Sequence, residues 1–397
     1  MFSVKEAKKI LWKNIKLIPA VSKKVSDISG YVLAENIKSP VDLPLFDQSA
    51  MDGFAVNFDD EDLRNEELSF RITGEIKAGD KPNGKLKKNS AVYIYTGAAT
   101  PLNTSCVVMQ EKVQTNYGSV IIPASALTKG SNIRFKGTQI KKGEPALAKG
   151  TLLNPAAVGF LCSMGISKIK VTGKPVVSVL STGNELQEAG SKLYKGQIFE
   201  SNSVMLKAAL NGNGFETKYV SSVNDDKKNL TSIVSKMLSS SDVLIISGGI
   251  SVGKYDLVKD ILENSGVKEL FYKVSQKPGK PLYCGKLKNK LIFALPGNPA
   301  ASLVCFYEYV LPSLRKMSGY SDFELSKEFL PLTESYELKG ERDLFLKAKI
   351  NNGKVTLLEG QGSDILKSFA EANALVYLSV NKRAIIKDDL VETHLIP

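Results

Sequence analysis

The chain has 397 residues, of which 43% are hydrophobic and 24% charged, with a formal net charge of +12 at pH 7. This length accommodates two to four domains, and the composition excludes a low-complexity chain. One histidine and four scattered cysteines exclude a Ser-His-Asp triad, an HExxH zinc site and a disulfide or cysteine-metal framework.

The N-terminal segment predicts a helix followed by extended chain up to about residue 45. Ser3 and Glu6 have capping-box spacing, and Val4, Ala7 and Leu11 share one helical face. Lysines interrupt the apolar residues here, which excludes a secretory signal, and no apolar run in the chain approaches the roughly 18 residues needed to span a bilayer. We therefore expect a cytoplasmic protein without a membrane partner.

The next segment, up to about residue 140, shows short apolar runs separated by turns. This pattern predicts an inserted β-rich domain over residues 46–140, with residues 1–45 and 141–172 forming a linking domain. In the second part of that linking domain, Asn154 as N-cap, Pro155 at the first helical position and Gly165 as the stop predict a helix. On its residues alone, Asp52 is a loop carboxylate without an assigned role.

Three apolar runs then end in glycine-rich turns. Residues 176–180, 243–246 and 291–295 predict buried parallel strands, and helices are expected over 202–210, 230–238, 256–264 and 300–316. This alternation predicts a doubly wound, mainly parallel α/β domain over residues 173–320. Ligands of such sheets bind outside the carboxyl ends of the strands, where these turns lie. Their glycines allow backbone N–H groups to approach an anion.

Charged side chains beside these turns have two interpretations each. Glu185 and Asp256 suit Mg²⁺ that bridges phosphate oxygens, or they are acids favoured at helix N-termini. Lys277 and Lys280, on a turn with two prolines, bind an oxyanion or form a solvated basic turn. The positive net charge likewise suits an anionic ligand or only solubility. Because the lysines are scattered, nucleic acid is not the expected anion.

Two segments resemble nucleotide-binding motifs but lack residues or a position that these motifs require. The glycine turn beginning at Gly248 nearly matches a Walker A loop, but Tyr255 replaces the hydroxyl residue that would hold Mg²⁺. Residues 211–214 follow a predicted helix rather than a strand, which excludes a dinucleotide fingerprint.

The C-terminal region, residues 321–397, predicts strands and hairpins. Residues 347–350 and 354–358 form a hairpin around Asn351-Asn352-Gly353, with glycine at a left-handed position. We expect a C-terminal β-barrel domain here, with His394 on an ordinary strand end.

Seven motifs in order resemble the MoeA family of molybdopterin molybdenumtransferases, which is related to the C-terminal domain of gephyrin. They cover essentially the whole chain: SAMDGFA at 49–55, YTGA at 95–98, GSNIR at 130–134, STGNEL at 181–186, SGGISVGKYD at 247–256, KPGKP at 277–281 and LPGNP at 295–299. The resemblance implies a MogA-like sheet domain and an enzyme that inserts molybdate into adenylated molybdopterin, releasing AMP in a Mg²⁺-dependent step. It also implies a homodimer of four-domain subunits, with the active site between the doubly wound domain of one subunit and the β-rich parts of the other. Transient contact with a MogA-type adenylyltransferase is a further expectation.

The resemblance also assigns functional residues. The catalytic residues are Asp52, Thr96, Glu185, Asp225 and Asp256, of which Glu185 and Asp256 hold the metal. The substrate-binding residues are Ser181, Gly183, Gly248, Gly249, Ser251, Gly253, Lys273, Lys277, Lys280, Pro296, Pro299, Arg342 and Ser363.

Two positions depart from the family pattern, namely Gln139 and Glu200, each in place of a usual aspartate. The departures leave a tungstate-specific paralogue open. An adenylyltransferase of molybdopterin and a non-catalytic, gephyrin-like scaffold are two further possible functions. The flanking domains argue against the adenylyltransferase, and the retained acidic residues argue against the scaffold.

Overall fold

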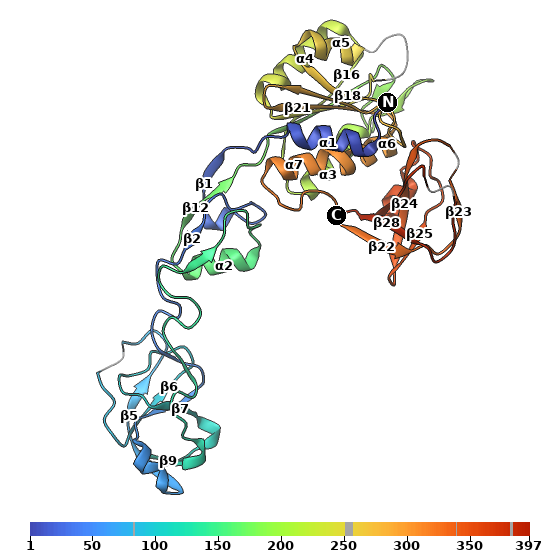
Figure 1. The fold of residues 1–397 in the computed structure, drawn as a ribbon. Helices are drawn as coiled ribbons and strands as arrows, with labels where there is room; N and C mark the ends of the chain where they lie inside the picture. The colour runs from blue at the N-terminus through green and yellow to red at the C-terminus, as the bar shows by residue number, and fades with distance from the viewer. Residues whose placement is uncertain (82–83, 251–256, 339, 382–383) are drawn as a thin grey trace. The chain divides into compact units, whose positions relative to one another are not determined.

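The computed structural model describes residues 1–81, 84–250, 257–338, 340–381 and 384–397, and divides the chain into two compact units (Figure 1). The first unit comprises Met1–Lys23, Ile28–Ala34 and Lys170–Pro397, and the second comprises Lys24–Asp27 and Glu35–Ile169. The strands β1 (Ala20–Lys24) and β12 (Lys168–Thr172) lie where the chain passes between them. The finer division into four domains stays a prediction.

The first unit contains a six-stranded sheet of order β16-β13-β17-β21-β20-β18. Its strands are β13 (Val177–Thr182), β16 (Thr217–Val223), β17 (Val243–Ser247), β18 (Lys268–Tyr272), β20 (Tyr283–Leu287) and β21 (Lys290–Leu295). The first four strands in this order are mutually parallel. β20 is antiparallel to its neighbour β21, and β18 is antiparallel to β20. Ser181 pairs with Ser247, and Ser247 pairs with Leu295. The three predicted strands therefore end at the same edge.

Alternate residues of these strands enter two separate cores, as the pleat of a strand requires. Val179 and Phe293 pack in one core, with the helices α1 (Val4–Asn14), α3 (Asn202–Gly212), α6 (Pro299–Cys305) and α7 (Leu311–Met317). Leu180 and Ile292 pack in the other, with α4 (Lys227–Ser240) and α5 (Leu257–Asn264). Helices cover both faces of the sheet (Figure 1). The prediction of a doubly wound, mainly parallel sheet agrees with this arrangement.

The N-terminal helix α1 begins as its sequence predicts. Ser3 Oγ accepts a hydrogen bond from the backbone N–H of Glu6 at 3.2 Å, and the Glu6 carboxylate accepts from the Ser3 N–H at 2.9 Å. Ala7 and Leu11 are fully buried in the core of the sheet. The capping box and the apolar stripe together fix where the helix begins and which face it buries.

The helix predicted over residues 300–316 is interrupted. A π-helical segment, Phe306–Val310, separates α6 from α7. Pro312 cannot donate a hydrogen bond to the carbonyl four residues earlier, which weakens the α-helical ladder at this point. The π-helical segment buries Glu308 and Tyr309, and both take part in a polar network described below.

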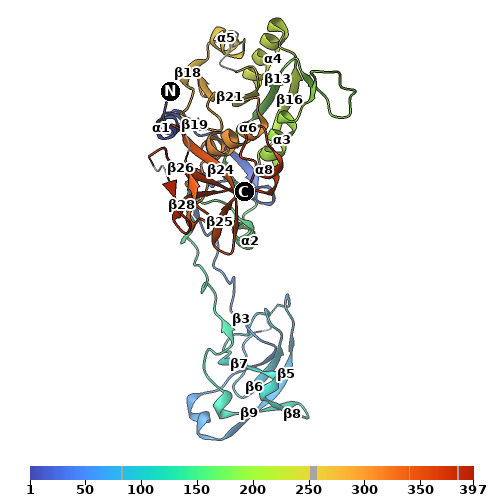
Figure 2. The same ribbon diagram turned by 90° about the vertical axis from the view of Figure 1, so that its right-hand side faces the viewer.

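The C-terminal region of the same unit forms a second sheet, of order β19-β24-β26-β28-β22 with β25 paired to β24 (Figure 2). Its strands are β19 (Gln276–Lys277), β22 (Lys327–Pro331), β24 (Asp343–Asn351), β25 (Lys354–Leu357), β26 (Ala374–Leu378) and β28 (Leu390–Leu395). The predicted hairpin is present, with Asn352 and Gly353 at positive φ. The barrel stays a prediction, since the recorded pairing runs from β19 to β22.

The second unit holds a third six-stranded sheet, of order β7-β4-β6-β5-β9-β8, and its core includes Phe54, Phe70 and Val120. Its strands are β4 (Gly53–Val56), β5 (Glu67–Ile76), β6 (Ser90–Ile94), β7 (Cys106–Met109), β8 (Gln114–Asn116) and β9 (Ser119–Pro123). The predicted helix is α2 (Pro155–Ser163), with Asn154 as its N-cap. No helix in the described part of the chain combines the length and apolar character that crossing a bilayer requires.

The remaining strands and the remaining α-helix are short. In the second unit they are β2 (Ile37–Lys38), β3 (Gln48–Ser49), β10 (Ile133–Arg134) and β11 (Pro145–Leu147), and in the first unit β14 (Leu186–Gln187), β15 (Ile198–Phe199), β23 (Tyr336–Glu337), β27 (Ala384–Ile385) and α8 (Lys367–Glu371).

Candidate functional site

A cavity of about 650 Å³ lies at the carboxyl ends of β13, β17 and β21. Each predicted turn contributes to its wall: Ser181, Thr182 and Gly183 from the first, Ser247, Gly248, Gly249 and Ile250 from the second, and Pro296, Gly297, Asn298 and Pro299 from the third. The structure therefore brings the three turns together around one space.

The turn after β17 leaves no room for a side chain at Gly248. Gly248 has φ +91°, and a Cβ there would lie 2.2 Å from the carbonyl oxygen of Thr182. A larger residue would separate the ends of β13 and β17. The close packing leaves a backbone turn at the cavity wall, where N–H groups can contact an anionic ligand.

Carboxylates also line the cavity, from Glu185, Glu200, Asp225 and Asp364. Asp225 Oδ1 accepts a hydrogen bond from Thr182 Oγ1 at 2.5 Å, and its backbone N–H donates to Asn184 Oδ1 at 2.9 Å. These two bonds hold Asp225 against the end of β13. Within the described residues, no group of three or more Asp, Glu, His or Cys side chains is placed to hold a metal.

The start of α3 joins two of the turns. Asn202 is 9% exposed, and its amide nitrogen donates to Ser247 Oγ at 2.8 Å and to the Gly297 carbonyl at 2.7 Å. Glu200, one of the departures from the family pattern, accepts from the N–H and hydroxyl of Ser203 at 2.8 and 2.7 Å. It therefore caps the same helix. Asn202 is not among the predicted site residues, because its only signal in the sequence is its place at a helix start.

The turn of residues 277–281 places its two lysines at different cavities. Lys280 lines the 650 Å³ cavity, together with Pro296 and Pro299. Lys277 instead lines a second cavity, of about 460 Å³, beside Tyr336 and Gln361. The structure therefore does not bring Lys277 to the same space as Glu185.

Lys273 and Arg342 line neither cavity. Lys273 Nζ lies 4.7 Å from the ring centroid of Tyr272, and Arg342 Nη1 donates to the Gln276 carbonyl at 3.4 Å. Their assignment as substrate-binding residues has no support from either cavity wall.

The loop of residues 358–365 approaches the cavity from the C-terminal sheet. Ser363 Oγ accepts from the Asn298 amide at 2.7 Å, and its carbonyl accepts from the Ala301 N–H at 3.0 Å, which ties the loop to the start of α6. Beneath the loop, the 3% exposed Lys347 donates to the carbonyls of Gly360, Gly362 and Ile365 at 2.6, 3.2 and 2.9 Å. Burial lowers the pKa of this lysine. Lys347 is not among the predicted site residues, because the alternating Lys-Ala-Lys-Ile pattern of residues 347–350 is typical of lysines that face outward.

Asp52 and Thr96 lie in the second unit, where they contact each other. Thr96 donates its backbone N–H and its hydroxyl to Asp52 Oδ1, both at 2.7 Å. These hydrogen bonds lower the pKa of the Asp52 carboxyl, the backbone bond most. Both side chains are exposed. Gln139, the other departure, is exposed, and its N–H donates to the Leu43 carbonyl at 2.8 Å.

Three predicted site residues, Ser251, Gly253 and Asp256, lie outside the described residues. The cavity that the described residues form therefore contains two of the predicted carboxylates, one of the predicted lysines and all three turns. This arrangement of oxygen ligands, a cation and exposed turn backbone suits a phosphate-bearing ligand.

Comparison with known proteins relates the chain to a known family. Residues 2–165 match the MoeA N-terminal region (domains I and II), and residues 178–316 match a probable molybdopterin binding domain. The chain is 33% identical to the molybdopterin molybdenumtransferase of Haemophilus influenzae, covering 89% of this chain and 88% of the relative. It is 34% identical to that of Nostoc sp., covering 91% and 86%.

Solved structures agree. A structure of the molybdopterin biosynthesis MoeA protein from Pyrococcus horikoshii has a TM-score of 0.81 at 31% identity, covering 100% of this chain and 99% of that one. Another structure of MoeA from this organism has a TM-score of 0.83 at 27% identity, with full coverage of both chains.

Proposed function

Since the chain belongs to the MoeA family of molybdopterin molybdenumtransferases, we propose that the 650 Å³ cavity is where it inserts molybdenum into adenylated molybdopterin. The enzyme is a transferase of molybdenum cofactor biosynthesis. The observation that carries the proposal is the convergence of three strand-end turns, Lys280 and two assigned carboxylates on one cavity.

The chemistry of the substrates fits this wall. Molybdate is a dianion, and adenylated molybdopterin carries a phosphoanhydride that breaks when AMP is released. Lys280 and the N–H groups of the turns at Gly248 and Gly249 would bind these oxygens and stabilise the charge that develops on the leaving phosphate. No side-chain nucleophile is required, which accords with a chain whose single histidine lies elsewhere.

Mg²⁺ would be held by Glu185 and Asp256, as the motifs imply. The described carboxylates fit this ion, because Mg²⁺ commonly takes one or two protein carboxylates and completes its shell with water and substrate phosphates. Glu185 lines the cavity wall, and a Cβ at Gly183 would lie 2.8 Å from both of its carboxylate oxygens, so the glycine leaves room for them. When bound, the ion would neutralise phosphate charge during AMP release.

We also propose a homodimer and a transient complex with a MogA-type adenylyltransferase that supplies the substrate. Ile198 and Phe199, in the cavity wall, are 54% and 46% exposed, and the nearby Val204 is 64% exposed. Apolar side chains exposed beside a site are typical of an interaction surface. The cytoplasm would be the compartment. Sedimentation of the purified chain tests the dimer.

The transferase assignment is tested by mixing the purified protein with adenylated molybdopterin, molybdate and Mg²⁺ and measuring AMP. We expect AMP release that Glu185→Ala reduces by about 100-fold or more, in the range found for lost transition-state charge stabilisation. Glu188→Ala is the matched control, because Glu188 is an exposed glutamate of the same loop that does not line the cavity.

Three different outcomes would each favour a different function. Adenylylation of molybdopterin from ATP would favour the adenylyltransferase, and turnover with tungstate but not molybdate would favour the tungstate paralogue. Tight peptide binding without any turnover would favour the scaffold. Absence of AMP release, or equal release from both glutamate variants, would refute the assignment of the cavity.

A further inference from the structure

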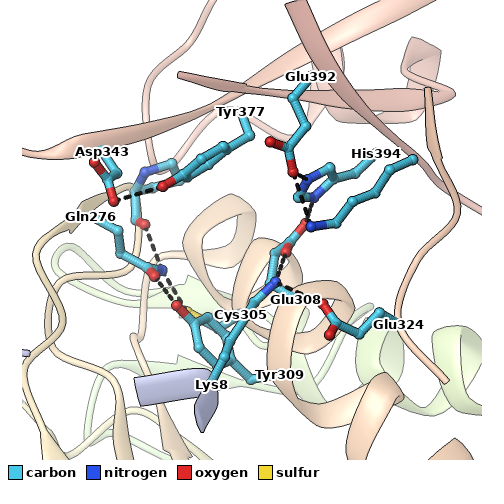
Figure 3. A network of polar contacts seen from close by, with 12 residues as sticks. Lys8, Gln276, Cys305, Glu308, Tyr309, Glu324, Asp343, Tyr377, Glu392 and His394 are labelled. Carbon is cyan, nitrogen blue, oxygen red and sulfur yellow. Dashed lines mark hydrogen bonds and ion pairs between the residues drawn. The ribbon is translucent and has the colours of Figure 1, made fainter. Parts of the chain in front are cut away.

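A buried glutamine lies directly beneath the lysine-bearing turn of residues 277–281. Gln276 is 0% exposed, and its Nε2 donates to the Pro278 carbonyl at 3.1 Å and approaches Cys305 Sγ at 3.7 Å. Its Oε1 accepts a hydrogen bond from the Tyr309 hydroxyl (Figure 3). The side-chain amide therefore links the turn to the interrupted helix at residues 299–317.

Contacts at the middle of the turn are equally tight. Gly279 has φ +93°, and a Cβ there would lie 2.6 Å from both Cys305 Sγ and Gln276 Nε2. The turn therefore rests directly on Cys305 and the amide. Its position depends on where these two groups lie.

Tyr309 determines how the amide is oriented. The tyrosine lies in the π-helical segment and is fully buried, and burial holds the pKa of its hydroxyl well above the ordinary value. The hydroxyl is therefore a proton donor at neutral pH, and it selects the amide oxygen. The amide nitrogen then faces the Pro278 carbonyl, as the hydrogen-bond capacity of the two groups requires.

The orientation of the 277–281 turn matters, because the lysines at its two ends line different cavities. Lys277 lines the 460 Å³ cavity and Lys280 lines the 650 Å³ cavity, only three residues apart. A rotation of the turn would move both ammonium groups. An apolar side chain at position 276 would fill the same core but could not bond the Pro278 carbonyl.

We propose that Gln276 and Tyr309 form a positioning pair that holds the 277–281 turn so that Lys280 faces the anion-binding cavity. The proposal rests on the proposed function only for the role of Lys280. Gln276 and Tyr309 line neither cavity, so both act through the turn rather than on the substrate.

The test measures the dissociation constant of AMP by calorimetry, together with the thermal midpoint of each variant. We expect Gln276→Met and Tyr309→Phe each to weaken AMP binding by about 3- to 10-fold, the range that one lost hydrogen bond produces. The double variant should bind AMP no more weakly than Gln276→Met alone, because the hydroxyl acts only through the amide. If Gln276→Met does not fold, Tyr309→Phe alone tests the proposal, because it removes only one oxygen atom.

Two further variants separate the explanations. Ser313→Ala removes a buried hydrogen bond to the Tyr309 carbonyl on the same helix, so it should lower the thermal midpoint without changing AMP affinity. Lys280→Met reports whether the lysine binds AMP at all. Unchanged AMP affinity in Lys280→Met would refute the role of Lys280 in the proposed function. Loss in Lys280→Met with none in Gln276→Met and Tyr309→Phe, or additive losses in the double variant, would overturn the positioning pair.

Discussion

Buried polar residues that do not line the cavity hold its loops in place by hydrogen bonds. Lys347 is one of them. Its ammonium group has three hydrogen-bond donors, and the carbonyls of Gly360, Gly362 and Ile365 occupy all three. The same loop also exchanges hydrogen bonds between Gln361 and the Lys347 backbone, at 2.9 and 2.8 Å. One side chain therefore determines the path of the loop that carries Ser363 and Asp364.

Replacing Lys347 by Met should disorder this loop. The three carbonyls lose a buried partner, which we expect to cost roughly 1–3 kcal/mol of unfolding free energy. AMP binding should weaken as well, because the loop no longer holds Ser363 against Asn298. Urea unfolding and AMP calorimetry measure the two effects. Lys349→Met is the control, since Lys349 lies on the same strand but is exposed; equal effects in both variants would contradict the role of Lys347.

At this scale the sequence predicts side chains that a local motif exposes, and misses those that a distant partner buries. Glu185 and Lys280 follow from the turns that carry them, and both line the cavity. Lys347, Gln276 and Asn202 do not, because each has a hydrogen-bond partner 13 to 95 residues away in the sequence. Periodicity contains no information on such contacts.

At the scale of the elements, the ends of β17 and β21 are joined by the start of α3. The Asn202 amide reaches Ser247 and Gly297, and Ser247 Oγ in turn donates to the Pro296 carbonyl at 3.3 Å. Two cavity turns that are far apart in the sequence therefore share one buried junction. Their separation sets the width of the cavity.

Asn202→Ala should loosen this junction. We expect a loss of roughly 1–3 kcal/mol in unfolding free energy and a weaker affinity for AMP, because the buried Ser247 hydroxyl and the Gly297 carbonyl lose their donor. Ser247→Ala removes the Asn202–Ser247 bond and the longer 3.3 Å bond to the Pro296 carbonyl but keeps the direct link from Asn202 to Gly297, so it should show a smaller effect on both measurements. Denaturant unfolding and calorimetry check this order. An Asn202→Ala variant with wild-type AMP affinity would show that the junction does not shape the cavity.

The elements themselves are well predicted where a local signal exists. Caps at Ser3 and Asn154 and the three apolar runs mark elements that the structure contains. The π-helical segment is not predicted, since its apolar residues also fit an uninterrupted α-helix. The π-helical segment instead depends on tertiary contacts, because Glu308 and Tyr309 each contact a buried partner from another element.

At the scale of the whole first unit, a buried ionic network joins its N-terminal helix, its π-helical segment and its C-terminal strand (Figure 3). Glu308 is 1% exposed and lies 2.7 Å from Lys8 Nζ and 2.6 Å from His394 Nδ1. His394 Nε2 lies 3.0 Å from Glu392, which also contacts Lys327 at 2.9 Å. The histidine expected on an ordinary strand end is instead a buried link between three segments.

The network makes stability depend on pH in two directions. Burial favours neutral forms, but Lys8 and His394 outweigh it at Glu308 and lower its pKa from 4.5 to about 2. Burial likewise opposes the charge of His394, but the two glutamates outweigh it and raise its pKa above 6.5. The Glu308 contribution is therefore present above about pH 4.5 and lost toward pH 2. The His394 contribution is present below about pH 6.5 and lost as the pH rises through the raised pKa.

His394→Gln separates these contributions, because glutamine can still donate a hydrogen bond to Glu308 but cannot carry a charge. Unfolding free energies measured by urea between pH 5 and 9 should fall on the alkaline side in the wild type and stay flatter in the variant. The gap between the two proteins should therefore be largest at the acid end of this range and should shrink as the pH rises through the raised pKa of His394. Measured from pH 5 down to pH 2, Glu308→Gln should instead reduce the acid decline below about pH 4.5, and Glu392, whose pKa is also lowered to about 2, should keep part of it. Parallel wild-type and His394→Gln curves across this range would mean that the buried histidine is neutral, and that hydrogen bonding alone joins the three segments.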